Sequence, residues 1–188
     1  MGVVCYLDPL GSGNSDPYKR EQVLYELGNP SAITTSAAIK VPKPGVYKLW
    51  LVGGGNTTNG CYIGCNYPGS AAGFIGKMYF NTKCYLRLII GGQDAYSYLQ
   101  VASWTAPDTW YNLVSCEAGK DGQLSGAGRG GYITVNRDSM FNNYFDIELE
   151  TNGNNGGNNS GWPASVYGGY GTKDINGYGK LQYIRMKQ

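Results

Sequence analysis

The chain has 188 residues, including 30 Gly and 17 Tyr, and only 15% of them are charged, so a helical bundle or a soluble α/β enzyme is disfavoured. Its lack of His excludes Ser-His-Asp and Cys-His nucleophile systems and removes the commonest zinc ligand. The net charge of +2 without a Lys/Arg cluster disfavours nucleic-acid binding, and the aromatic content of 13% argues against disorder.

Residues 1–41 are predicted to form an N-terminal arm with one short helix near residues 17–27. Asp16 is a good N-cap residue, Pro17 suits the first helical position, and Gly28 can close the helix. The Ser/Thr/Ala-rich segment that follows the helix is expected to be extended. The first residues, from Met1 onward, lack the basic start and the apolar core of a secretory signal.

Residues 42–188 are predicted to form a glycine-rich, β-sandwich-like domain with long Gly/Asn loops, so that the fold class is all-β. The first strand, residues 46–52, is apolar on both faces and should lie in the middle of a sheet. A turn is expected at residues 106–108. The other strands are expected at residues 74–80, 85–90, 98–104, 111–117, 132–136, 145–150 and 181–186.

Five cysteines occur at positions 5, 61, 65, 84 and 116, an odd number, so at least one is free or joins another chain. Cys84 and Cys116 lie in strand-like sequence and are expected to be reduced and buried. Cys61 and Cys65 have three residues between them, which leaves a loop disulfide open but does not match a usual zinc pair. We therefore expect no metal site and no cofactor.

The triplet Gly53-Gly54-Gly55 directly follows the first apolar strand. A phosphate-binding loop would need a further glycine pattern and a following helix, and neither is present. Close packing of backbone segments is the favoured interpretation, because glycine allows an approach that a side chain would block.

Asp146, Glu148 and Glu150 alternate with apolar residues and are expected on the solvated face of a strand. Cation binding at this face remains open. Carboxylates spaced by two also lie about 7 Å apart, a separation that inverting glycosidases use. Sequons for N-glycosylation begin at Asn56 and Asn158, but such matches are frequent in a chain rich in Asn.

A recognition surface is predicted in the C-terminal Gly/Asn/Tyr region. Tyr and Trp give rigid contact area, and Asn gives adaptable hydrogen bonds. Alternatively, these rings cover glycine backbone inside the fold. The candidate ligand-binding residues are Trp162, Tyr167, Tyr170, Tyr178, Asn154, Asn155 and Asn158.

Three features resemble the glycine-rich domains at the tips of bacteriophage tail fibres and in some bacterial surface adhesins. They are the segment from Pro44 to Gly55, the segment from Ala72 to Gly92, and the closing segment from Gly177 to Arg185. The resemblance covers roughly residues 42–186 and consists of the placement of strands and glycines. It implies a module of a virion tail or a cell surface that binds a host receptor, often as a trimer.

The favoured function is therefore non-enzymatic binding of a host cell-surface glycan or protein, by a homo-oligomer of a tail fibre or adhesin. Two alternatives remain open. One is a depolymerase or glycosidase that uses Asp and Glu, which needs two carboxylates from different strands in one cleft. The other is a structural virion protein without a ligand of its own.

Overall fold

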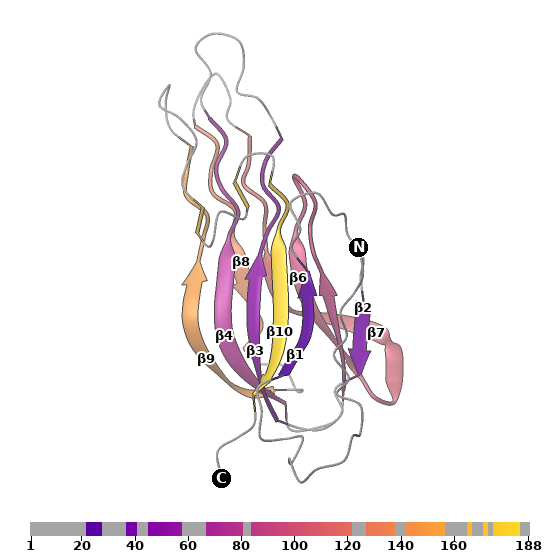
Figure 1. Ribbon diagram of the computed structural model, residues 1–188. Coiled ribbons are helices and arrows are strands. Elements are labelled where there is room, and N and C mark those ends of the chain that lie inside the picture. Colours follow the sequence, from indigo (N-terminus) through magenta and orange to yellow (C-terminus); the bar gives the residue numbers. More distant parts are fainter. Residues whose placement is uncertain are drawn as a thin grey trace.

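The protein is all-β and sandwich-like, with two five-stranded antiparallel sheets, and the described residues contain no helix (Figure 1). The fold class predicted from the sequence is thereby confirmed. The structure is a computed structural model that describes residues 22–27, 37–40, 45–57, 67–80, 84–121, 127–137, 142–156, 165–166, 171–172 and 175–184.

Each sheet combines strands that are far apart in the sequence. The first sheet has the order β1 (Gln22–Leu27), β10 (Tyr178–Ile184), β3 (Gly45–Val52), β4 (Gly73–Phe80) and β9 (Asn142–Thr151). The second sheet has the order β2 (Ala37–Lys40), β5 (Cys84–Ile89), β6 (Ser97–Ser103), β7 (Ala106–Cys116) and β8 (Ile133–Val135). As predicted, β3 is central in its sheet.

The predicted helix is wrong over residues 22–27, which form the strand β1, and residues 17–21 lie outside the described residues. β1 pairs with the edge of β10. A short isolated helix is marginal in water, whereas a sheet edge offers backbone partners to any extended segment. Both β1 and β2, which fall in the expected N-terminal arm, are edge strands of the two sheets.

The turn predicted at residues 106–108 is also wrong. The hairpin turns at Trp104-Thr105, since Ser103 pairs with Ala106, and β7 begins directly afterwards. Pro107 lies at an exposed position of this strand, where proline is tolerated because no ladder hydrogen bond is required of it.

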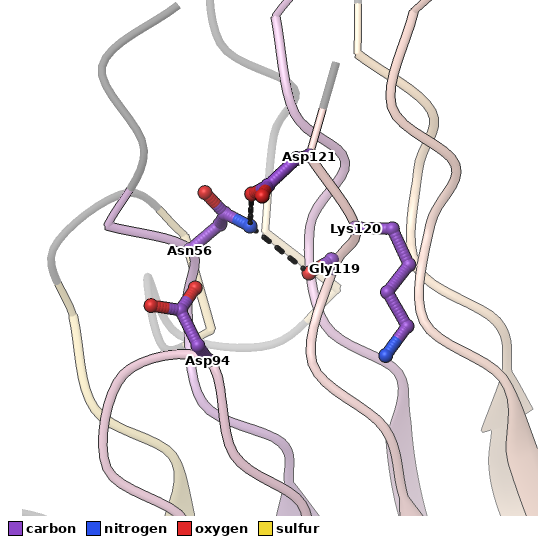
Figure 2. A pocket seen from close by; sticks show the side chains of 5 residues that line it. All are labelled: Asn56, Asp94, Gly119, Lys120 and Asp121. Atoms are coloured by element: carbon purple, nitrogen blue, oxygen red, sulfur yellow. Dashed lines mark hydrogen bonds between the residues drawn. The ribbon is translucent and has the colours of Figure 1, made fainter. Parts of the chain in front are cut away.

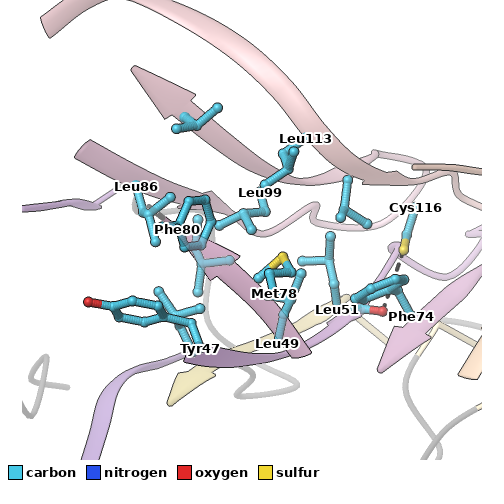
Figure 3. Packing of buried hydrophobic residues seen from close by; sticks show 14 of the residues in the cluster. Tyr47, Leu49, Leu51, Phe74, Met78, Phe80, Leu86, Leu99, Leu113 and Cys116 are labelled. Atoms are coloured by element: carbon cyan, nitrogen blue, oxygen red, sulfur yellow. Dashed lines mark hydrogen bonds between the residues drawn. The ribbon is translucent and has the colours of Figure 1, made fainter. Parts of the chain in front are cut away.

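The core lies between the two sheets (Figure 3). From the first sheet, Tyr47 and Phe80 meet edge to face, with ring centroids 5.6 Å apart. Leu86 and Leu99 belong to the second sheet and lie in the same buried cluster. Buried residues alternate with less buried ones along β5, and along β4 from Phe74 onward, which places one face of each strand in this core.

Cys84 and Cys116 are free and buried, as predicted. Burial raises the pKa of Cys84 to about 12 and raises the pKa of Cys116 still further. The Cys116 thiol donates to the Leu51 carbonyl oxygen at 3.4 Å and so links the two sheets. Both residues therefore act as small apolar core groups. Cys5, Cys61 and Cys65 lie outside the described residues.

Candidate binding surface

One end of the sandwich holds most of the glycines that the structure describes. In antiparallel sheets the ends of β3, β5, β7 and β9 meet the starts of β4, β6, β8 and β10. Beyond these strand ends the described chain continues as extended segments, at the top of Figure 1. We call them the glycine end: residues 53–57, 67–72, 90–96, 117–121, 127–132, 152–156, 171–172 and 175–177.

Residues 67–72 lie at the centre of the glycine end, and consecutive backbone N–H groups in this segment donate to different neighbouring segments. The bonds run from Gly69 to Lys120 (3.0 Å), from Ser70 to Asn154 (2.8 Å), from Ala71 to Gly171 (2.9 Å) and from Ala72 to Glu117 (3.0 Å). A β-strand pairs with at most two neighbours in one plane. Here several segments surround a central one, and the N–H groups of Gly69, Ser70, Ala71 and Ala72 bond to those neighbours rather than within their own segment.

This packing requires glycine. A Cβ atom on Gly54 would lie 1.7 Å from the Gly92 carbonyl oxygen, and one on Gly153 would lie 1.8 Å from the Ser70 carbonyl oxygen. The packing interpretation of Gly53–Gly55 is therefore confirmed. Their N–H groups donate to carbonyl oxygens of Ala72, Ala95 and Ile175, so these groups are already used and cannot hold a phosphate.

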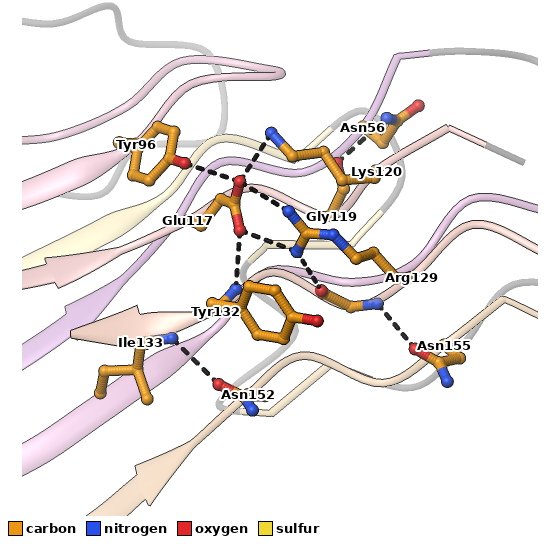
Figure 4. A network of polar contacts seen from close by, with 11 residues as sticks. Asn56, Tyr96, Glu117, Gly119, Lys120, Arg129, Tyr132, Ile133, Asn152 and Asn155 are labelled. Atoms are coloured by element: carbon orange, nitrogen blue, oxygen red, sulfur yellow. Dashed lines mark hydrogen bonds and ion pairs between the residues drawn. The ribbon is translucent and has the colours of Figure 1, made fainter.

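Glu117 is a buried carboxylate at the base of the glycine end, with 3% of the residue exposed (Figure 4). Its Oε1 accepts from the Tyr96 hydroxyl at 2.6 Å, and its Oε2 accepts from the Tyr132 backbone N–H at 3.0 Å. Lys120 Nζ and the Arg129 guanidinium each approach it to 2.8 Å. Burial alone would raise the pKa of Glu117, but hydrogen bonds from Arg129, Lys120 and Tyr96 outweigh it and hold that pKa well below its ordinary range.

Two tyrosines of this network reach the surface. The exposed fraction is 38% for Tyr96 and 54% for Tyr132, and Tyr111 on β7, at 52%, is the other exposed large hydrophobic side chain among the described residues. The Arg129 guanidinium lies over the Tyr132 ring at 4.0 Å, so one ring face is covered and the ring is held in place. Tyr96 stacks on Tyr98 with centroids 5.6 Å apart. We call Tyr96, Glu117, Lys120, Arg129 and Tyr132 the Glu117 network.

Asparagines flank the network along the continuation of β9. The Asn155 side-chain oxygen accepts from the Gly130 N–H at 2.9 Å, and that of Asn152 accepts from the Ile133 N–H at 3.0 Å. Asn154 is exposed; its carbonyl oxygen accepts from the Ser70 N–H at 2.8 Å, and its backbone N–H donates to the Ser70 hydroxyl at 2.9 Å. The predicted residue Asn155 therefore contacts Gly130, next to Arg129, whereas Asn154 contacts Ser70; the sequence did not single out Arg129 or Tyr132.

Tyr178 does not fit the predicted role of a ligand contact. The residue is 7% exposed and packs in a small cluster with Val52 and Ala71, so its ring lies inside the fold. This is the alternative that the sequence left open for the C-terminal rings. Trp162, Tyr167, Tyr170 and Asn158 lie outside the described residues, and their predicted role in binding stays a prediction.

A polar pocket lies next to the Glu117 network, with Lys120 belonging to both (Figure 2). It has a volume of about 380 Å³ and is lined by Asn56, Asp94, Gly119, Lys120 and Asp121. Asn56 is only 3% exposed, and its amide nitrogen donates to Asp121 Oδ1 at 2.6 Å and to the Gly119 carbonyl oxygen at 3.2 Å. The side chain of Asn56, the first residue of the first sequon, is thus buried and its amide nitrogen is already hydrogen-bonded.

The acidic face of β9 is paired with two lysines of the same sheet, on β3 and β4, and with Arg137, which follows β8 of the second sheet. Glu148 lies 2.6 Å from Lys48 Nζ, Asp146 lies 3.6 Å from Lys77 Nζ, and Glu150 forms an ion pair with Arg137. The strand itself is confirmed as half-buried and alternating. Within the described residues, no group of three or more His, Cys, Asp or Glu could hold a metal ion.

The chain matches no protein-family model, no curated protein and no solved structure. In the described part of the chain, no helix is long and apolar enough to cross a membrane.

Proposed function

We propose that this chain is a non-enzymatic receptor-binding module of a phage-like tail fibre or surface adhesin, which binds a host cell-surface glycan or protein through the glycine end. The observation that carries the proposal is the placement of Tyr96 and Tyr132. Both exposed rings are held over a rigid, backbone-bonded support. Binding residues commonly lie on loops that a rigid scaffold positions.

The chemistry around the rings suits a receptor with many hydroxyl or amide groups. Tyr132 offers an aromatic surface, Asn152 is bonded to the adjacent residue Ile133, and Asn154 is a further exposed asparagine on the continuation of β9. Tyrosine contributes contact area at low conformational cost, and asparagine both donates and accepts hydrogen bonds. Assembly as a homo-oligomer, often a trimer in the proteins that the sequence resembles, is part of the same proposal.

The test compares Tyr132→Ala with Tyr111→Ala, because the two side chains have nearly equal exposed fractions of 54% and 52%. Binding is measured on a panel of intact bacterial strains and on a glycan array. By analogy with base stacking, loss of a stacking ring costs about 1–3 kcal/mol, so Tyr132→Ala should bind about tenfold more weakly or worse. Tyr111→Ala should bind like the wild type. Equal binding by all three proteins would place the receptor site elsewhere, and absence of any binding by the wild type would refute the proposal.

A carboxylate-dependent glycosidase is the second candidate, and it rests on Asp94 and Asp121, which come from different segments and line one pocket. The pocket has a polar lining and both residues are exposed, whereas the general acid of such enzymes lies in an apolar environment. Release of reducing sugar from a bound glycan, abolished by both Asp94→Asn and Asp121→Asn, would favour the enzyme.

A further inference from the structure

We propose that the pocket beside Asn56 is a subsite for one neutral or amino sugar unit of the receptor glycan, with Asp94 as its principal hydrogen-bond acceptor. The inference deepens the proposed function and rests on it. The pocket volume of about 380 Å³ falls in the range of about 300–1,000 Å³ that is usual for small-ligand sites. Its polar lining suits a ligand with many hydroxyl groups better than an apolar one.

Asp94 is fixed in position before any ligand arrives. Its backbone N–H donates to the Gly55 carbonyl oxygen at 2.7 Å. The Thr57 backbone N–H donates to Asp94 Oδ1 at 3.1 Å, and the Thr57 hydroxyl donates to the other oxygen, Oδ2. An ionised carboxylate can accept about four hydrogen bonds, so each oxygen keeps acceptor capacity toward the solvent. A pair of neighbouring sugar hydroxyls can donate to these two oxygens.

Asn56 gives the pocket a rigid wall. It is buried, and its amide nitrogen is bound to Asp121 and to the Gly119 carbonyl oxygen. Figure 2 shows Asn56 between Asp94 and Asp121, with all three side chains on the same side of the pocket. A site whose polar groups are already oriented loses less entropy when it binds.

The charge of the lining restricts the class of sugar. Lys120 also lines the pocket, but its ammonium group lies 2.8 Å from Glu117 Oε1, and in Figure 2 its side chain runs away from the two aspartates. A ligand therefore meets carboxylates first. Like charges brought together across an interface are unfavourable, so sialylated, sulfated or phosphorylated sugars should be rejected.

The experiment measures binding of the wild type, Asp94→Asn, Asp121→Asn and the control Asp108→Asn on an array of neutral, amino and acidic oligosaccharides. Asp108 is an exposed residue of β7, so its substitution removes the same charge away from the pocket. Hydrogen bonds to charged groups are stronger than those between neutral groups, so Asp94→Asn should weaken binding to neutral or amino sugars by about tenfold or more. Asp108→Asn should match the wild type. Thermal unfolding checks that each variant folds. If Asp94→Asn does not fold, the binding of Asp121→Asn tests the subsite instead.

The outcomes separate the two proposals. Wild-type binding that Asp94→Asn and Asp121→Asn leave unchanged overturns the subsite and leaves the receptor-binding proposal in place. Preference for acidic sugars, or binding that requires added Ca²⁺, also overturns the subsite, as does binding to bacterial cells with no glycan recognised on the array. A wild-type protein that binds neither the array nor any cells refutes both.

Discussion

Replacing Glu117 by Gln should destabilise the protein markedly, because this residue connects three segments of the glycine end. Oε1 accepts from Tyr96, Lys120 and Arg129, and Oε2 accepts from Arg129 and the Tyr132 N–H. In the Gln variant one of these two oxygens is replaced by an amide nitrogen, which is a donor. At either position this new donor faces at least two other donors and cannot bond to them. The substitution keeps the volume of the side chain, so the loss reports on hydrogen bonding and charge rather than on a cavity.

The size of this loss in stability depends on how far the hydrogen-bond partners of Glu117 are buried. Lys120 and Arg129 have 43% and 39% of their side chains exposed, so water can replace much of what they lose. If Oε2 becomes the amide nitrogen, the part-buried Tyr132 N–H loses its acceptor, and an unsatisfied donor costs about 1–3 kcal/mol. Together with the lost charge–dipole interactions, we expect a loss of about 2–4 kcal/mol in the free energy of unfolding. For a protein of this size that corresponds to a fall in Tm of roughly 5–15 °C.

Urea and thermal denaturation of Glu117→Gln measure this loss, with Glu148→Gln as the control. Glu148 also lies in ion pairs, with Lys48 and Lys77, but 41% of its side chain is exposed, and such pairs contribute less than about 1 kcal/mol. Equal losses for the two variants would refute the reasoning, because they would show that the buried network contributes no more than a surface ion pair.

The pH dependence gives a second check on the same residue. The pKa of Glu117 in the folded protein lies below its ordinary value of 4.5. Its contribution to stability is therefore complete above that value and is lost as the pH falls toward the folded pKa. The difference in stability between the wild type and Glu117→Gln should be constant near neutral pH and should shrink below about pH 4.5. A difference that grows on acidification would contradict this assignment.

Two further predictions concern groups whose pKa is raised. The hydrogen bond to Glu117, together with burial, raises the pKa of Tyr96 from 10.0 to about 12, so its contribution to stability is complete below pH 10 and is lost as the pH rises toward 12. The difference in absorbance between the wild type and Tyr96→Phe, followed as the pH rises, should show one phenol that ionises well above pH 10. A titration midpoint near 10 would contradict the hydrogen bond to Glu117. Iodoacetamide at pH 8 should leave Cys84 and Cys116 unmodified in the folded protein but react with both in urea, because burial raises the pKa of each thiol. Peptide mass mapping distinguishes these two from the other cysteines, and rapid native labelling of either one would contradict their place in the core.

Local patterns were sufficient to predict most of the strands. The apolar run at residues 46–52 and the alternation at residues 145–150 each match a strand of the structure. A strand that is buried on one or both faces needs apolar residues at every second position or at every position, and this pattern is visible in the local sequence. The prediction for residues 22–27 was wrong because this strand is determined by a distant partner rather than by its local sequence. The strand depends on pairing with β10, about 150 residues later in the chain, and a local sequence pattern does not indicate such a partner.

The site was harder to predict because glycine packing is a long-range property. The sequence indicated that Gly54 permits close approach, but not that the approaching group is Gly92. The same applies to the start of the Asn/Gly run at residues 152–156, which is ordered by backbone hydrogen bonds rather than by buried apolar surface. A usable signal for Glu117 did exist. A carboxylate directly after the apolar run that ends at Cys116 and directly before Ala118-Gly119 must either leave the core or find partners there.

The measurement that tests the central claim most directly is the stability of Gly54→Ala against that of Gly92→Ala. The claim is that backbone contacts that only glycine allows order the glycine end. A Cβ atom at Gly54 would lie 1.7 Å from the Gly92 carbonyl oxygen, whereas one at Gly92 would meet nothing closer than Asn176 Oδ1 at 3.9 Å. Urea unfolding should show a loss of at least about 3 kcal/mol for Gly54→Ala and a change within about 1 kcal/mol for Gly92→Ala. Equal stability of the two variants would contradict the account.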